Sequence, residues 1–192
     1  MIGDEDWLPP LLWCGGEMTI RIYSVLDSNS LREATNESYE HLKPWMPWAV
    51  KDQTNVQAER TCRRLMSAYL GESDFSVGIW SGAILVGGTG FHLRGRPLDS
   101  KTGEIGMWIR ASHANQGWGT RVLEQMIEWG FTEWGWERLF WQCDTRNTGS
   151  RRVAEKAGMT LEGTFRADMI DTEGNRCDSH RFAILKSEWQ KR

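Results

Sequence analysis

The stretch of sequence that decides the fold covers residues 104–120 and reads EIGMWIRASHANQGWGT. Its beginning, Glu104 to Arg110, predicts a strand, whereas from Gln116 onward the apolar residues follow the spacing of a helix. The glycines between the two let the backbone approach a ligand closely, and the first helical turn offers unpaired N–H groups at the positive end of the dipole. The turn is therefore suited to a pyrophosphate, although the same spacing also occurs in ordinary tight turns.

The segments on both sides of this stretch predict one mixed α/β domain. The expected order is strand, two helices, three strands, helix, strand, helix and two strands, without a linker or repeat. Asp27 or Ser28 is expected to cap the first helix, Thr54 the second and Asn147 the last. The strands are expected at residues 18–25, 75–80, 84–93, 104–110 and 139–143, with two more after Gly158 joined by the turn 171–174.

The beginning of the chain differs in composition from the rest. Residues 1–16 are acidic, then proline-rich, and end in two glycines, so we interpret them as an N-terminal extension. Their apolar piece, Leu11 to Trp13, is expected to add to the edge of the sheet. Residues 17–192 then form the single domain, and a chain of this length buries about 70% of its unfolded surface.

Composition limits the classes of function. With 40% hydrophobic and 26% charged residues the chain resembles an ordinary soluble protein, and its net charge of −3 argues against direct nucleic-acid binding. No run approaches the roughly 18 apolar residues of a membrane span. The four cysteines, Cys14, Cys62, Cys143 and Cys177, lie far apart and without metal-ligand spacing. We expect free thiols in the reducing cytoplasm, no bound metal and no membrane contact.

Several motifs together resemble those of the GNAT acetyltransferase superfamily, and within it the RimJ/RimL branch of ribosomal-protein N-terminal acetyltransferases. The matching segments are residues 104–109 (EIGMWI), 116–120 (QGWGT), 147–150 (NTGS), 157–159 (AGM), 45–48 (WMPW) and 162–166 (EGTFR). The resemblance covers roughly residues 17–189. It implies a central twisted, mostly antiparallel sheet of about seven strands, splayed in the middle and flanked by about four helices. It also implies acetyl-coenzyme A (acetyl-CoA) as cofactor.

The resemblance assigns the cofactor-binding residues. The strand around Met107 and Ile109 is expected to part from its neighbour, so that its backbone pairs with the pantetheine arm and an N–H holds the thioester oxygen. Asn147 is expected to cap its helix and to contact the same arm. The turn that binds the pyrophosphate comprises Gln116, Gly117, Trp118, Gly119, Thr120 and Arg121. Two positions depart from the family pattern: Arg121 replaces the usual Gly or Ala, and Met107 replaces an aromatic residue.

Two residues are candidates for catalysis. The hydroxyl of Ser150 is expected to protonate the departing thiolate or to donate a hydrogen bond to it. Glu104 is the candidate general base, acting through water; the alternative is a structural ion pair at the end of a strand. Deprotonating an α-amine at pH 7 costs only about 1 kcal/mol, against about 4.6 kcal/mol for a lysine amine. One modest carboxylate therefore suits a protein N-terminus or a small amine.

The acceptor pocket is marked by aromatic and acidic side chains. Trp45 and Trp48 flank Pro47 and are expected to form a pocket wall. Asp168 and Asp178 are expected to attract a cationic amine, as are Glu37 and Glu40, the alternative being solvated charges. The favoured acceptor is a protein N-terminal α-amine. The alternatives are an aminoglycoside or polyamine acetyltransferase and a non-catalytic acyl-CoA sensor, and a homodimer is among the oligomeric states left open.

Overall fold

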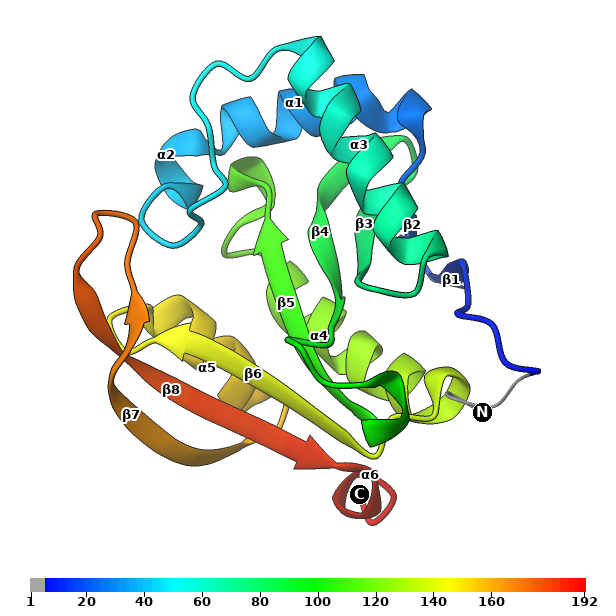
Figure 1. The fold of residues 1–192 in the computed structure, drawn as a ribbon, viewed down its shortest axis with the longest axis vertical. Coiled ribbons are helices and arrows are strands. Elements are labelled where there is room, and N and C mark those ends of the chain that lie inside the picture. The colour runs from blue at the N-terminus through cyan, green and yellow to red at the C-terminus, as the bar shows by residue number, and fades with distance from the viewer. Residues whose placement is uncertain (1–5) are drawn as a thin grey trace.

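The computed structural model describes residues 6–192 as a mixed α/β fold built on an open sheet (Figure 1). The sheet contains eight strands in the order β1-β2-β3-β4-β5-β6-β8-β7. All neighbouring pairs are antiparallel except β5 and β6, which are parallel. The fold class and the mostly antiparallel sheet are confirmed. The strand beyond the seven expected is β1, which pairs with β2 at the edge, as expected for Leu11 to Trp13.

The bounds of the elements follow the predicted order closely. The strands are β1 (Leu12–Gly15), β2 (Met18–Ile22), β3 (Phe75–Ser81), β4 (Ile84–His92), β5 (Thr102–Ile109), β6 (Arg138–Asp144), β7 (Thr160–Ile170) and β8 (Arg176–Leu185). The helices are α1 (Ser28–Glu37), α2 (Tyr39–Leu42), α3 (Asn55–Leu70), α4 (Trp118–Trp129), α5 (Thr148–Lys156) and α6 (Lys186–Trp189). The short helices α2 and α6 account for the difference from the four expected.

Helices cover both faces of the sheet (Figure 1). On one face, Leu31 and Ala34 of α1 and Cys62 of α3 pack against Trp80 and Leu85 of the sheet. On the other face, α4 and α5 enclose the main core, to which the odd-numbered residues of β3 and β5 point. These two layers fix the sheet in place while leaving its central strands free to diverge.

The helix caps agree with the sequence at two of three positions. Thr54 accepts from the Gln57 amide, and the Gln57 side chain accepts from the Thr54 amide, which forms a reciprocal capping box. Asn147 accepts from the amide of Ser150 at 3.0 Å. Asp27 precedes α1 but makes no cap, because its carboxylate is held by Arg21 at 2.7 and 2.8 Å.

The helix after the glycine turn does not run regularly to residue 134 as its spacing suggested. It ends at Trp129 and continues as a π-helical turn over Gly130–Trp134. Trp134 is fully buried and lies against Phe75 and Phe91, each with ring centroids 4.9 Å away. The wider turn brings this side chain into the core.

The described part of the N-terminal extension, residues 6–16, packs on the domain. The ring centroid of Trp7 lies 5.7 Å from that of Trp134, and the hydroxyl of Tyr69 donates to the carbonyl of Pro10. In residues 6–192 no helix is both long and apolar enough to cross a bilayer. Within the same residues, no cluster of three or more His, Cys, Asp or Glu side chains is arranged to hold a metal ion.

Candidate active site

The two parallel strands at the centre of the sheet separate along their length. β5 and β6 pair at Thr102↔Arg138, Gly103↔Leu139 and Glu104↔Phe140, and in the described chain the pairing ends there. Beyond this point β5 stays paired with β4, and β6 stays paired with β8. A V-shaped opening therefore lies between Ile105–Ile109 and Trp141–Asp144, and the divergence is visible in Figure 1. The predicted splay is confirmed.

The hydrogen-bond phase of β5 shows which amides face this opening. The amide of Arg110 donates to the carbonyl of Val86 at 2.7 Å. In an antiparallel pair, residues alternate between those bonded to the partner strand and those pointing away from it. Counting back from Arg110 along β5, the even-numbered residues bond to β4. The N–H groups of Met107 and Ile109 consequently point into the opening, as expected of a strand that receives an amide-bearing ligand.

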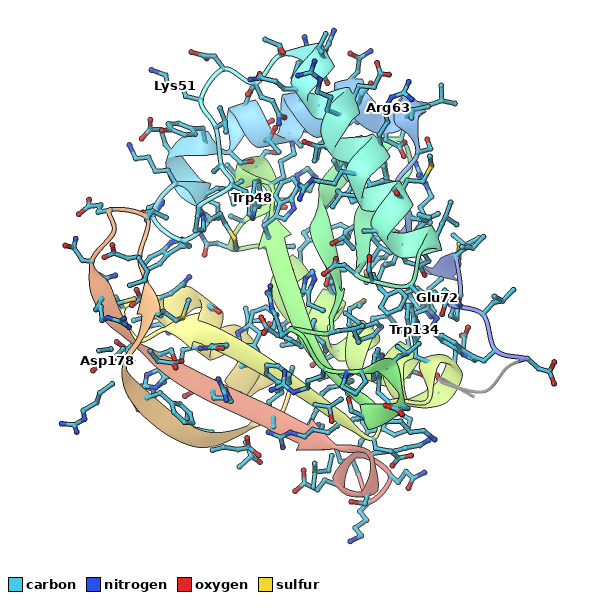
Figure 2. The ribbon with its side chains drawn as sticks, in the orientation of Figure 1. Trp48, Lys51, Arg63, Glu72, Trp134 and Asp178 are labelled. Atoms are coloured by element: carbon cyan, nitrogen blue, oxygen red, sulfur yellow. The ribbon has the colours of Figure 1, made fainter. Side chains whose placement is uncertain are left out.

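A cavity of about 720 Å³ occupies the opening and extends over the face of the sheet that α1 and α3 cover. Trp45, Trp48 and Trp108 form part of its wall, and the rings of Trp48 and Trp108 meet edge to face with centroids 5.8 Å apart. Figure 2 shows Trp48 near the end of β5. The structure thus brings both predicted tryptophans to the cavity and adds Trp108, whose position on a strand gave no indication of this contact.

The start of α5 forms the opposite wall. Asn147 and Ser150 both line the cavity. The Ser150 hydroxyl oxygen accepts a hydrogen bond from the indole N–H of Trp141 at 2.9 Å. Because that bond uses an acceptor position of the oxygen, the hydroxyl hydrogen of Ser150 remains available for donation to another atom. Cys143 lies on the same wall, and burial raises the pKa of its thiol.

Glu104 lies at the point where the strands part. Its two carboxylate oxygens accept from Arg94 at 2.9 and 3.0 Å, and its side chain is only 11% exposed. The pair is bidentate, so the charge of Glu104 is largely compensated. The structure therefore shows the ion pair that was the alternative to a base, in a residue that also lines the cavity.

The glycine turn follows β5 and opens α4. Gly117 adopts a left-handed conformation with φ of 82°, and the helix has no side-chain cap, which leaves its first-turn amides to an external acceptor. A Cβ at Gly119 would lie 3.2 Å from a methyl group of Val153, so this glycine also permits close packing of α4 and α5. Gln116 donates to the carbonyl of Ser112 at 2.7 Å and closes the turn on itself.

Arg121 is directed away from the cavity. Its guanidinium lies 4.3 Å from the ring centroid of Trp118 and donates to Glu17 at 2.6 Å. It lines a second, smaller groove beside β1 and β2. Trp118 is buried, whereas Thr120 is half-buried in the first turn of α4. Of the predicted pyrophosphate contacts, only the backbone of the turn is thus clearly available.

The predicted acidic residues of the acceptor side lie outside the cavity wall. Asp168 accepts from Gln142 at 2.7 Å and from Ser179 at 2.8 Å. Asp178 accepts from the amide of Ala167 and belongs to the β7–β8 region (Figure 2). Glu37 is held by Arg110, whose hydrogen bond lowers the pKa of its carboxyl group to about 2.

One pair that sequence reasoning missed lies on the cavity wall. Nδ1 of His92, at the end of β4, is 2.6 Å from the carboxylate of Asp74, which precedes β3. Both side chains line the cavity. The residues are 18 positions apart and neither belongs to a recognisable motif. Only the antiparallel pairing of β3 with β4 brings them together.

A mostly antiparallel sheet that opens between two parallel central strands, next to an uncapped glycine-rich helix entrance, is the architecture of an acyltransferase that binds its donor as an added strand. Sequence comparison agrees, since a profile of the acetyltransferase (GNAT) domain matches residues 18–160. The chain belongs to the GNAT acetyltransferase family. Enzymes of this family use acetyl-CoA, and the residues at the opening fit that group, because free amides face where its own amides would lie.

Two relatives from Bacillus subtilis show how far the likeness extends. The N-acetyltransferase YnaD, itself uncharacterized, is 34% identical over 89 residues, which are 46% of this chain and 51% of YnaD. The putative ribosomal N-acetyltransferase YdaF is 25% identical over 176 residues, or 90% of this chain and 93% of YdaF. The chain therefore spans about half the length of one relative and nearly all of the other.

Solved structures agree with the fold. A GNAT-family acetyltransferase from Bacillus anthracis superposes with a TM-score of 0.75 at 26% identity, over 93% of this chain and 100% of that one. The ribosomal-protein-S5-alanine acetyltransferase of Vibrio fischeri gives a TM-score of 0.81 at 16% identity, over 94% and 99% of the two chains. At the second identity the likeness concerns the fold alone. The resemblance to the GNAT superfamily is thereby confirmed.

Proposed function

We propose that this chain is an acetyl-CoA-dependent N-acetyltransferase that acts on a primary amine, with a protein N-terminal α-amine as the favoured acceptor. The observation that carries the proposal is the cavity at the parting of β5 and β6, into which the amides of Met107 and Ile109 point. These amides suit the pantetheine arm and the thioester oxygen of the donor. Similarity to YdaF over nearly the whole chain supports the ribosomal type of acceptor.

The chemistry follows from the groups around the opening. The amine nitrogen attacks the thioester carbon, the carbonyl oxygen becomes negative, and the carbon–sulfur bond then breaks to release the thiolate of coenzyme A. In this proposal the N–H of Met107 stabilises the oxyanion. The bond that the oxygen of Ser150 accepts from Trp141 leaves the hydroxyl hydrogen to be donated to the sulfur. Asn147 positions Ser150 through the amide of that residue.

The kind of amine that the site accepts is inferred from how strong a base the reaction needs. A partly neutral α-amine costs about 1 kcal/mol to deprotonate at pH 7, which a single modest base supplies. The aromatic wall of Trp45, Trp48 and Trp108 suits the backbone and first side chain of a peptide more than a multiply charged polyamine. A cytoplasmic location and a homodimer remain predictions.

The first test is binding of the cofactor. Acetyl-CoA at about 100 times its Kd should stabilise the folded chain by about 2.7 kcal/mol, which for a domain of this size raises Tm by roughly 5–11 °C. No rise at millimolar acetyl-CoA would contradict the proposal.

The second test is a thiol-release screen against peptides with varied N-termini, aminoglycosides and polyamines. Release with peptides alone supports the favoured acceptor, and release with small amines alone supports the alternative. Binding without release indicates a sensor. In the same assay Ser150→Ala should lower kcat while leaving the thermal shift intact, whereas Ser187→Ala on α6 serves as a matched control. Equal losses of kcat and binding would show that Ser150 only binds.

A further inference from the structure

We propose that His92, oriented by Asp74, is the general base that takes the proton from the acceptor amine, and that Glu104 acts only through its ion pair with Arg94. This inference rests on the proposed function, because it assigns a residue to the same acetyl transfer. It differs from the expectation drawn from sequence, in which Glu104 was the base. The argument uses the geometry of the cavity wall around β4 and β5.

The first step is the orientation of the imidazole. One oxygen of Asp74 lies 2.6 Å from Nδ1 of His92, and its other oxygen accepts from the hydroxyl of Ser76 at 2.6 Å. A carboxylate accepts only, so Nδ1 carries the hydrogen and Nε2 has the lone pair. This arrangement fixes the tautomer that a general base requires, in the way a carboxylate orients histidine in other enzymes.

The second step is the access of Nε2. No hydrogen bond joins this atom to another of the described residues, and it is not among the enclosed polar atoms without a partner. His92 is nevertheless held firmly, with 17% of its side chain exposed and its ring on the cavity wall. Nε2 therefore opens to the cavity.

The third step is the position of Nε2 relative to the reacting carbon. The Nε2 edge of the ring lies directly over Gly106, where an added Cβ would be only 2.6 Å from Nε2. Gly106 immediately precedes Met107, whose N–H points into the opening. The imidazole thus lies on one side of the strand segment that would hold the thioester. Ser150 lies on α5, which packs on the opposite face of the sheet with α4. His92 therefore faces the attacking amine from one side of the sheet, and Ser150 faces the departing sulfur from the other.

The charged groups that face His92 distinguish it from Glu104. Glu104 is its direct partner across β4 and β5, but both carboxylate oxygens are bound by Arg94. Asp74 remains charged, since the hydrogen bond and charge of His92, Ser76 and Arg94 outweigh the effect of burial and lower its pKa. From α3, Arg64 also borders the cavity. Among the described residues, Asp74 is thus the one carboxylate hydrogen-bonded to the imidazole, and it stabilises the imidazolium that forms.

The proton balance is complete with these groups. The neutral amine forms its C–N bond to the thioester carbon, and Nε2 of His92 takes a proton from the attacking nitrogen. The C–S bond breaks with its electron pair on sulfur, and the thiolate gains a proton from the hydroxyl of Ser150, which takes one from water in turn. His92 then returns its proton to solvent. The products are an N-acetylated amine and free coenzyme A.

The test compares His92→Gln with Glu104→Gln in pH profiles of kcat/KM, using acetyl-CoA and a peptide with a free α-amine. We expect His92→Gln to lower kcat by about 10²–10⁴-fold. The fall of kcat/KM at low pH, which is the acid limb of the profile, should also disappear in this variant. Asp74→Asn should lower kcat by a smaller factor and shift the acid limb to lower pH. His180→Gln is the matched control, because His180 contacts Thr164 on the β7–β8 pair and lies off the cavity wall. Imidazole added to His92→Ala should restore part of the rate.

Two results would overturn the assignment. One is an acid limb that persists in His92→Gln and disappears in Glu104→Gln. The other comes from a ¹⁵N NMR titration of the acetyl-CoA-bound protein, which needs no acceptor: a hydrogen on Nε2 of His92 throughout pH 5 to 9 would exclude it as a base. The acetyl-CoA thermal shift should be unchanged in all variants. Absence of the acetyl-CoA thermal shift in the unmutated protein would instead refute the proposed function.

Discussion

Met107→Pro removes a single N–H from the site and nothing from the ladder between β4 and β5. The amide of Met107 points into the opening, in the phase set by the bond from Arg110 to Val86. Proline lacks this hydrogen and is tolerated where the N–H faces away from a partner strand. If this amide holds the thioester oxygen, its loss should lower kcat by about 10²–10³-fold, equivalent to roughly 2.7–4 kcal/mol.

The cost to stability should be smaller than the cost to the rate. The side chain of Met107 is half-buried against the core, so its replacement forfeits about 1–3 kcal/mol of burial. For a domain of this size that lowers Tm by roughly 2–12 °C. Gly106→Pro is the contrasting variant, because the amide of Gly106 belongs to the ladder with β4 and a ring there would meet His92. We expect it not to fold.

The assay is thiol release at saturating acetyl-CoA and peptide, with circular dichroism to confirm folding. Met107→Leu keeps the N–H and a similar volume, and should retain nearly full kcat. A folded Met107→Pro protein with kcat within threefold of Met107→Leu would refute the inference that this amide stabilises the oxyanion.

Three further predictions concern stability and its coupling to the site. Thr54→Ala should lower the free energy of unfolding by about 1 kcal/mol without changing kcat, as measured by urea denaturation, because it removes the cap of α3. Hydrogen bonds from Arg146 lower the pKa of Asp144 to about 2, so this pair contributes stability above pH 4 that is lost as the pH falls towards 2. Arg146→Gln should therefore lower the free energy of unfolding at pH 7 and lower it much less at pH 2, and equal losses at both would contradict the cause. Gly119→Ala brings a methyl group 3.2 Å from Val153 and should push the first turn of α4 away from α5. We expect weaker acetyl-CoA binding, measured by calorimetry, with only a small fall in Tm.

The parts of the fold predicted correctly are those determined by neighbouring residues. The caps at Thr54 and Asn147 depend on hydrogen bonds that span three residues, which the sequence displays directly. The strand and glycine turn of residues 104–120 are equally local. The expected cap at Asp27 or Ser28 was wrong, because the carboxylate of Asp27 is bound by Arg21 of the preceding strand and Ser28 already belongs to the helix.

The irregular end of α4 had a different cause. Phe131 and Trp134 continue the helical spacing of the residues before them, and that spacing predicts a regular helix. In the fold, Trp134 packs between aromatic rings from the sheet and the extension, and the chain widens into a π turn to allow it. Tertiary packing decides such a detail, and no local pattern contains it.

The site was predictable in its backbone but less so in its side chains. The parting of the strands just before Met107 followed from the family resemblance, and the expected wall at Trp45 and Trp48 followed from aromatic side chains in a proline-fixed loop. The partner of Glu104 is Arg94, ten residues away in the turn after β4, and His92 meets Asp74 only through strand pairing. Charge partners of this kind depend on register, which a single sequence does not specify.

The divergence of β5 and β6 also has a cost for the protein. Each strand carries, inside the sheet, a row of unsatisfied backbone groups of the kind found on an outer margin, where foreign chains attach and aggregation begins. Here that margin lies in a recess, screened by α4 and α5 behind it and by bulky indole rings in front. The recessed position of these groups thus protects the protein against aggregation and also favours a slender, flexible ligand over the strand of another polypeptide.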